Sequence, residues 1–293
     1  RWVVYGVAAA GDACFVEGSI VPVVATYRSW DANPSEPPGY VGRVCLPPVP
    51  VIHDGRPLDL SPIAQRVGAT KLAVVVTSLD TQAVSRGWVV DWLTFEVEEI
   101  EAAVGKALIG IVEGPPGSLS LLAVDQVHVV PLDALDAAPR SIELAVRQGE
   151  KATAGLWLDS GRFAYGTTRG GVRVARAFET FMQVEQDVPP PSAAIGQRPD
   201  VTLMQRSADA AVLLALHRYR GLVRTFSLAG GVAPLAGLSV AGPFNATVAA
   251  DGTFRVTADN NVVVVSQASG AILETGWQSH RFGAPVSAPS RCE

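Results

Sequence analysis

The tripeptide 159–161, Asp-Ser-Gly, is the sequence feature closest to a known catalytic signature. It follows two apolar residues, as in one half of an aspartic protease site. That chemistry needs two carboxylates that share one proton. Neither 79–82 nor 250–253 supplies a second copy in the right order, and Arg162 stands where a small hydroxyl residue is needed. We therefore interpret Asp159 as part of a hairpin turn.

A run of glutamates is the second candidate for chemistry. Glu96 and Glu98 alternate on one face of an expected strand, and Glu99 and Glu101 follow them. Paired carboxylates can hydrolyse glycosides or hold calcium. A solvated strand end explains the same pattern more simply, and we adopt that interpretation.

Histidine and glycine patterns for metals and phosphates are missing. The four histidines, at positions 53, 128, 217 and 280, form no His-x-x-x-His pair, and no Cys-x-x-Cys occurs. The sequence also lacks Gly-x-Gly-x-x-Gly, Gly-Lys-Ser/Thr and Gly-x-Ser-x-Gly. We therefore predict no catalytic, cofactor-binding or metal-binding residue, no cofactor, and a protein that is not an enzyme.

Three cysteines leave their pairing open. Cys292 stands next to the last residue, and an odd number argues against a disulfide framework. Cys14 and Cys45 would form a disulfide only if neighbouring strands bring them together. Otherwise they are buried free thiols.

Composition sets the class of protein. Of the 293 residues, 48% are hydrophobic and 17% charged, which excludes a disordered chain, and the 28 glycines and 21 prolines exclude a coiled coil. The net charge of −5 argues against nucleic-acid binding. The longest apolar runs, such as 72–76 and 262–265, are too short to span a membrane.

Short apolar runs bounded by Gly, Pro, Asp or Asn predict a mainly β protein. We expect antiparallel β-sandwich or barrel-like domains with one helix near 207–220, which begins at a Ser207 cap and stops at Gly221. No fixed-period repeat is visible. The expected strands are 21–27, 71–78, 87–98, 107–113, 118–131, 141–147, 153–159, 162–168, 172–184, 222–228, 238–241, 246–249, 253–258, 261–267 and 271–278.

Proline marks the expected domain boundary. Segment 188–199 contains three consecutive prolines and predicts a stiff spacer. It would separate a β-rich N-terminal domain, 1–187, from a C-terminal domain, 200–293, that carries the helix and a sandwich-like sheet.

Aromatic and proline-rich loops are the expected contact surfaces. Trp30, Tyr40, Pro190 and Trp277 are our candidate partner contacts, because aromatic loops on β scaffolds favour binding. Small Ala/Val-rich β domains with proline linkers resemble virion or tail-assembly components of tailed bacteriophages. That resemblance implies a structural protein in a virion, or extracellular, that contacts its own copies or other virion proteins. A secreted or surface domain that binds glycans or a host receptor is the alternative.

Overall fold

We describe the fold from a computed structural model of the chain. The structure describes residues 2–28, 39–78, 85–191, 200–229, 231–240, 242–243, 245–249, 251–258 and 261–277. The chain divides into two compact units, a first unit of residues 1–141 and a second unit of residues 142–293.

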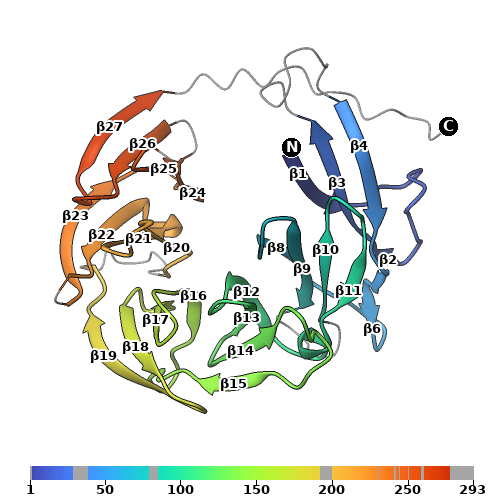
Figure 1. The fold of residues 1–293 in the computed structure, drawn as a ribbon, viewed down its shortest axis with the longest axis horizontal. Helices are drawn as coiled ribbons and strands as arrows, with labels where there is room; N and C mark the ends of the chain where they lie inside the picture. The colour runs from blue at the N-terminus through green and yellow to red at the C-terminus, as the bar shows by residue number, and fades with distance from the viewer. Residues whose placement is uncertain are drawn as a thin grey trace. The chain divides into compact units, whose positions relative to one another are not determined.

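The first part of the chain folds into separate antiparallel sheets (Figure 1). A three-stranded sheet is followed by two four-stranded ones, and two short strand pairs lie between. The strands are β1 (Trp2–Val7), β2 (Ser19–Ile20), β3 (Pro22–Arg28), β4 (Gly39–Cys45), β5 (Val49–Pro50), β6 (Ile52–His53), β7 (Arg56–Pro57), β8 (Leu60–Arg66), β9 (Lys71–Ser78), β10 (Arg86–Asp91), β11 (Val97–Glu99), β12 (Leu108–Glu113), β13 (Ser118–Ala123), β14 (Gln126–Pro131) and β15 (Arg140–Glu143).

The second unit contains three four-stranded antiparallel sheets, β16–β19, β20–β23 and β24–β27. In each sheet, strands that follow one another in the chain lie side by side, so each sheet is a meander. The strands are β16 (Ala152–Trp157), β17 (Arg162–Thr167), β18 (Val172–Ala177), β19 (Met182–Val188), β20 (Leu203–Arg206), β21 (Val212–His217), β22 (Leu222–Ser227), β23 (Ala233–Ser239), β24 (Asn245–Val248), β25 (Thr253–Thr257), β26 (Asn261–Ser266) and β27 (Ile272–Trp277).

The core of the second unit lies between its sheets. Leu213 and Ala215 of β21 pack in a cluster with Val174 of the sheet before it. The alternate residues of β21 join a second cluster, which contains Phe254 of the sheet after it. Since successive side chains of a strand point to opposite faces, β21 is buried on both sides.

The predicted helix near 207–220 is wrong. Residues 212–217 form strand β21, and only the short 3-10 helix η3 (Arg218–Arg220) follows it. The hydroxyl of Ser207 accepts hydrogen bonds from the backbone N–H groups of Ala211 (3.0 Å) and Val212 (2.9 Å), so this residue caps a turn instead. A strand buried on both faces is apolar without alternation, and periodicity alone does not separate it from a buried helix.

The other predicted strands lie close to observed strands, but some of them join two neighbouring strands into one. Strand β9 coincides with the expected 71–78. Segments 87–98, 118–131 and 172–184 were each expected as one strand, and each contains a turn between two strands. The mainly β, antiparallel class is confirmed, whereas successive meander sheets take the place of a sandwich or barrel.

Helical structure in the described ranges is limited to short 3-10 turns such as η2 (Glu101–Ala103) and η3. No helix there is long and apolar enough to cross a membrane.

Candidate functional site

A pocket of about 230 Å³ lies in the second unit, between the β16–β19 sheet and the end of the β20–β23 sheet. Its apolar part is formed by Leu158, Val174, Leu228 and Val232. The polar lining groups are Arg162, Glu185 and Gln186, and Gly231 completes the wall. The lining therefore combines apolar surface with polar groups that could orient a ligand.

A β-bulge sets the position of Glu185, one of the residues that line this pocket. In the β18–β19 ladder Val174 pairs with Gln186, whereas Ala175 pairs with Val184. Glu185 is therefore the extra residue of β19, without a register partner. Bulges redirect side chains and occur often beside functional sites.

A loop from the neighbouring sheet closes the pocket. The side-chain oxygen of Gln186 accepts a hydrogen bond from the backbone N–H of Val232. Gly231 has a φ of +138°, which side-chain-bearing residues rarely adopt, and a Cβ there would stand 2.7 Å from Nε2 of Gln186. The positive φ therefore favours glycine at this position of the loop.

Four charged residues form a row beside the pocket, which we call the charged row: Asp159, Arg162, Arg176 and Glu185. Arg162 and Arg176 are register partners on β17 and β18. Nε of Arg162 donates to Asp159 and Nε of Arg176 donates to Glu185, each at 2.7 Å. Each arginine thus has its own carboxylate, which offsets the repulsion between neighbouring cations.

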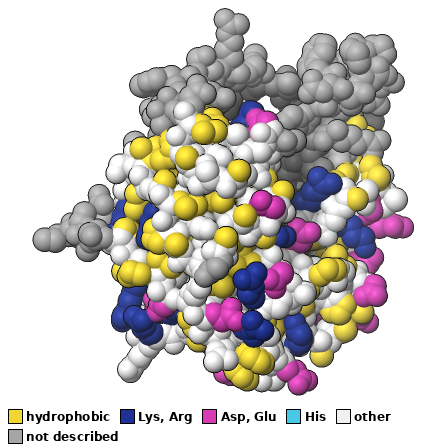
Figure 2. Space-filling view, turned by 60° about the vertical axis from the view of Figure 1, so that its left-hand side comes forward, with side chains coloured by type: hydrophobic (Ala, Val, Ile, Leu, Met, Phe, Trp, Pro, Cys, Tyr) yellow, Lys and Arg dark blue, Asp and Glu magenta, His cyan; other side chains and the backbone are white. Residues whose placement is uncertain are grey.

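The pKa values in the charged row are shifted in the directions that these ion pairs predict. The hydrogen bond that Arg176 donates to Glu185 raises the pKa of Arg176. Burial alone would raise the pKa of Asp159, but hydrogen bonds from the Arg162 side chain and from the backbone of Gly161 and Arg162 lower it below its usual value. Figure 2 shows positive and negative side chains interspersed on one face of the molecule, with no large area of one sign.

Two exposed phenylalanines form the tip of the β18–β19 hairpin. The rings of Phe178 and Phe181 stack with centroids 4.9 Å apart and planes 14° apart. The two residues are 39% and 49% exposed. By strand alternation they lie on the same face of the sheet as Arg176. The backbone carbonyl of Thr180 accepts from the N–H of Glu143 at 2.9 Å, which fixes the tip.

A buried ion pair lies on the opposite face of the same sheet. Arg173 donates to Glu150 at 2.7 Å, and the two side chains are 3% and 2% exposed. Arg173 also contacts Asp187 at 3.3 Å and donates to the carbonyl of Ala145 at 3.1 Å. The hydroxyl of Tyr165 donates to the same carbonyl at 2.9 Å. This network joins three strands to the segment before β16.

Burial and hydrogen bonding oppose one another in this pair. Burial would raise the pKa of Glu150, but hydrogen bonds from Thr167 and Arg173 outweigh it, so the pKa lies below its usual value. Burial would lower the pKa of Arg173, but Glu150 and Asp187 raise it overall. Both groups are therefore charged at neutral pH.

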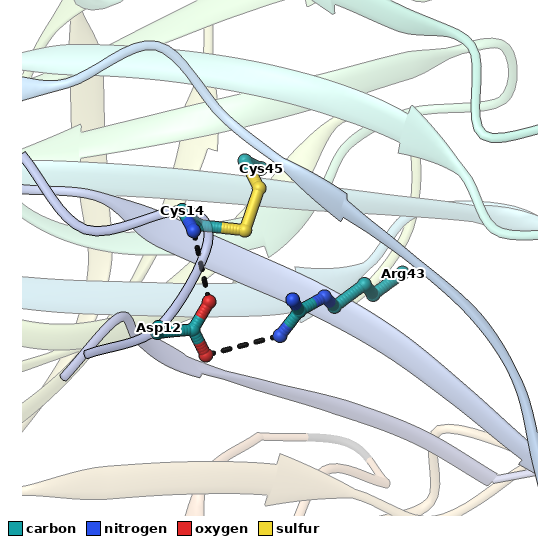
Figure 3. The surroundings of a disulfide bond; sticks show 4 residues. All are labelled: Asp12, Cys14, Arg43 and Cys45. Carbon is teal, nitrogen blue, oxygen red and sulfur yellow. Dashed lines mark hydrogen bonds and ion pairs between the residues drawn. A yellow bond between two sulfur atoms is a disulfide. The ribbon is translucent and has the colours of Figure 1, made fainter. Parts of the chain in front are cut away.

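In the first unit, the structure pairs Cys14 with Cys45 in a disulfide (Figure 3). Asp12 accepts a hydrogen bond from the backbone N–H of Cys14 at 2.9 Å and forms a 3.0 Å ion pair with Arg43. The segment before β2 is thus attached to strand β4 by one covalent and one ionic link.

The candidate contact residues are only partly described. Trp30 lies outside the described residues. Tyr40 and Trp277 lie in β4 and β27, paired with Tyr27 and Asn261, but their side chains are not among the described ones. Their role in partner contact stays a prediction.

Pro190 is exposed and follows β19. The carbonyl of Pro189 accepts from Arg224 at 3.3 Å and that of Pro191 accepts from Arg220 at 2.9 Å. The described start of the expected spacer is therefore held against β22 and the turn before it, and residues 192–199 lie outside the described residues.

Of the acidic residues singled out in the sequence, Glu98 and Glu99 lie in the short strand β11, whereas Asp159 and Glu96 occupy turns. Asp159 accepts from the backbone N–H groups of Gly161 and Arg162, both at 2.8 Å, in the hairpin between β16 and β17, as expected. Glu96 accepts from the hydroxyl of Thr94 at 3.2 Å in the turn before β11. No group of three or more His, Cys, Asp or Glu side chains within the described ranges is placed to hold a metal.

The pocket and the phenylalanine pair were not found from the sequence. Phe178 and Phe181 flank a turn, which the expectation of a single strand over 172–184 hid. Arg162, Glu185 and Gly231 come from segments far apart in the chain. Glu185 is positioned by a bulge that no feature of the sequence indicates.

No protein-family model matches this sequence, and no curated protein matches it. Many solved structures match the fold. The Pseudomonas aeruginosa periplasmic gluconolactonase PpgL aligns with a TM-score of 0.62 and 14% identity, over 94% of this chain and 81% of that one. The described sheets are consistent with a β-propeller.

Two further matches have lower TM-scores. The Cps50 (Swd1) β-propeller domain of Myceliophteria thermophila aligns with a TM-score of 0.54 and 12% identity, over 73% of this chain and 68% of that one. A chain of the mitotic checkpoint complex aligns with a TM-score of 0.53 and 12% identity. This alignment covers 71% of this chain and 61% of that one. At these identities the likeness concerns the fold alone.

Proposed function

We propose that this β-propeller-like chain is a non-enzymatic interaction protein that associates with a second copy of itself. The observation that carries the proposal is the exposed, stacked pair Phe178–Phe181. Aromatic side chains are enriched at the centres of protein interfaces, and an exposed apolar group on a folded domain favours contact with a partner.

Charge supports a second copy as the partner. The charged row holds two cations and two carboxylates, so it can face its own copy across a two-fold axis with opposite signs aligned. Phe178 follows Arg176 by two residues, about 7 Å of extended chain, just beyond the end of β18. One contact surface would therefore combine an aromatic anchor with a self-complementary polar part.

A bacteriophage virion or tail component is the narrower form of this proposal. It rests on the composition of the sequence. The Cys14–Cys45 disulfide favours a location outside a reducing compartment, which suits a virion or extracellular protein. Imaging of purified particles, in which this chain should recur in a symmetric array, tests that narrower form.

Sedimentation of the purified chain tests the association itself. We expect the mass to rise from monomer to dimer with concentration, and the Phe178→Ala/Phe181→Ala double variant to remain monomeric over the same range. The matched control is Leu273→Ala, which truncates another exposed apolar residue and should dimerise as the natural chain does. A natural chain that stays monomeric at the highest soluble concentration overturns the proposal.

Two other experimental outcomes would change the proposed function. One of the structural neighbours is a gluconolactonase; hydrolysis of a gluconolactone by the purified chain would overturn the non-enzymatic part. Binding on a glycan array that is lost in Trp30→Ala or Trp277→Ala would instead support the glycan-binding alternative.

A further inference from the structure

We propose that the pocket between the two sheets binds an apolar side chain of an extended peptide segment from a partner protein. This rests on the proposed function only in that the chain binds proteins. The pocket shares Arg162 and Glu185 with the charged row but includes neither phenylalanine. The pocket would let the chain recognise a specific segment of a partner protein, in addition to associating with its own copy.

The size of the pocket suits one side chain. A cavity of about 150 Å³ lined by apolar residues holds benzene. At about 230 Å³, this pocket is somewhat larger. Pockets for whole drug-sized ligands usually measure roughly 300–1,000 Å³, so a single branched or aromatic side chain is a better fit.

The polar lining groups match a peptide backbone. Nε of Arg162 is held by Asp159, and its terminal nitrogens are further donors. Gln186 uses its oxygen to hold the Val232 loop, and its NH₂ group is a donor. Glu185 supplies a carboxylate acceptor beside them. An extended peptide presents a carbonyl and an N–H next to each side chain, which are the complementary groups.

Two structural features hold this arrangement in place. The bulge sets Glu185 apart from the β18 register. The Gly-only backbone at residue 231 brings the loop against Gln186. The polar groups are thus fixed before a ligand arrives, and a preorganised site loses less entropy on binding.

Ligand-observed NMR with two blocked amino acids tests the pocket. The probes are N-acetyl-leucine N-methylamide and N-acetyl-glycine N-methylamide, which share a backbone and differ in the side chain. We expect saturable millimolar binding of the leucine probe and at least about tenfold weaker binding of the glycine probe. The probes are added to the monomeric Phe178→Ala/Phe181→Ala variant, because a dimer formed through the charged row would cover Arg162 and Glu185 at the pocket.

Two variants and one control locate the binding. Val232→Trp should fill the pocket and abolish binding of the leucine probe, whereas Arg162→Gln should weaken it several-fold. The control is Arg255→Gln, since Arg255 forms a comparable 2.7 Å pair with Asp251 on another sheet. Unchanged circular dichroism of each variant excludes unfolding.

Three results would overturn the inference: no saturable binding of the leucine probe, equal binding of both probes, or binding unaffected by Val232→Trp. Failure of this test in the monomeric double variant, while the natural chain still dimerises, removes the pocket alone. Binding of the leucine probe by a chain that stays monomeric removes the self-association alone.

Discussion

Arg173 and Glu150 form an ion pair in the second unit whose two side chains are almost completely buried. Removing one member of a buried ion pair leaves an uncompensated buried charge, whereas exposed pairs contribute little. Arg162 and Asp159, at 41% and 45% side-chain exposure, illustrate the second case on the same sheet. The two pairs therefore form a natural comparison.

We expect Arg173→Met to lower the free energy of unfolding at neutral pH by about 3–5 kcal/mol. The pKa of Glu150 is depressed in the folded chain, so its contribution is present above its unfolded pKa and is lost as the pH falls through the folded pKa. The difference between variant and natural chain should therefore shrink on acidification. Urea unfolding at several pH values measures it.

Arg162→Met is the matched control for that prediction, because it removes an exposed arginine of the same sheet. Its effect should stay within about 1 kcal/mol. If both variants lose the same free energy, the buried pair has no special role in stability.

At the scale of elements, the segment that begins at Ser207 shows how tertiary packing determines secondary structure. Ser207 and Asp209 both accept hydrogen bonds from the backbone N–H of Ala211, as capping residues do at a helix start. The chain then enters a strand, because β21 lies between two sheets and packs against both. The turn requires Ala210 to adopt a positive φ of 55°.

Ala210→Gly should raise the free energy of unfolding by roughly 0.5–1 kcal/mol. The left-handed conformation costs a non-glycine residue about 1–2 kcal/mol, and the greater unfolded-state entropy of glycine offsets part of the gain. Chemical denaturation measures the change.

Ala208→Gly, in the same turn but outside the left-handed region, provides the control. It should leave stability unchanged or lower it, because only the entropy cost applies. A stabilising effect of equal size at both positions would contradict the explanation.

At the scale of the whole molecule, the disulfide distinguishes the two units. Cys14 and Cys45 are 31 residues apart and both belong to the first unit. A cross-link stabilises by restricting the unfolded chain, and a loop of this length predicts about 3–4 kcal/mol. The sheets of the second unit are held by their own apolar clusters.

We expect Cys14→Ser/Cys45→Ser to lower hydrogen-exchange protection in β3 and β4 while leaving β21 and β22 unchanged. Mild reduction of the natural chain should give the same pattern. Equal loss of protection in both units would show that they unfold together, and no loss in β3 or β4 would show that the bond contributes nothing to stability.

The sequence by itself determined the β class, the positions of most strands and the hairpin turn at Asp159, because alternation, turn residues and strand propensity are local. It left open whether Cys14 and Cys45 pair, since that depends on which strands lie side by side. The repeating meanders leave no repeat in the sequence, because many apolar combinations fill the same space between sheets.

Only the tertiary structure decided that 212–217 is a strand and that Arg162, Glu185 and Gly231 meet. In the first case, burial on both faces removes the alternation on which sequence interpretation depends. In the second, a one-residue bulge and a loop from another sheet bring together groups that are far apart in the chain.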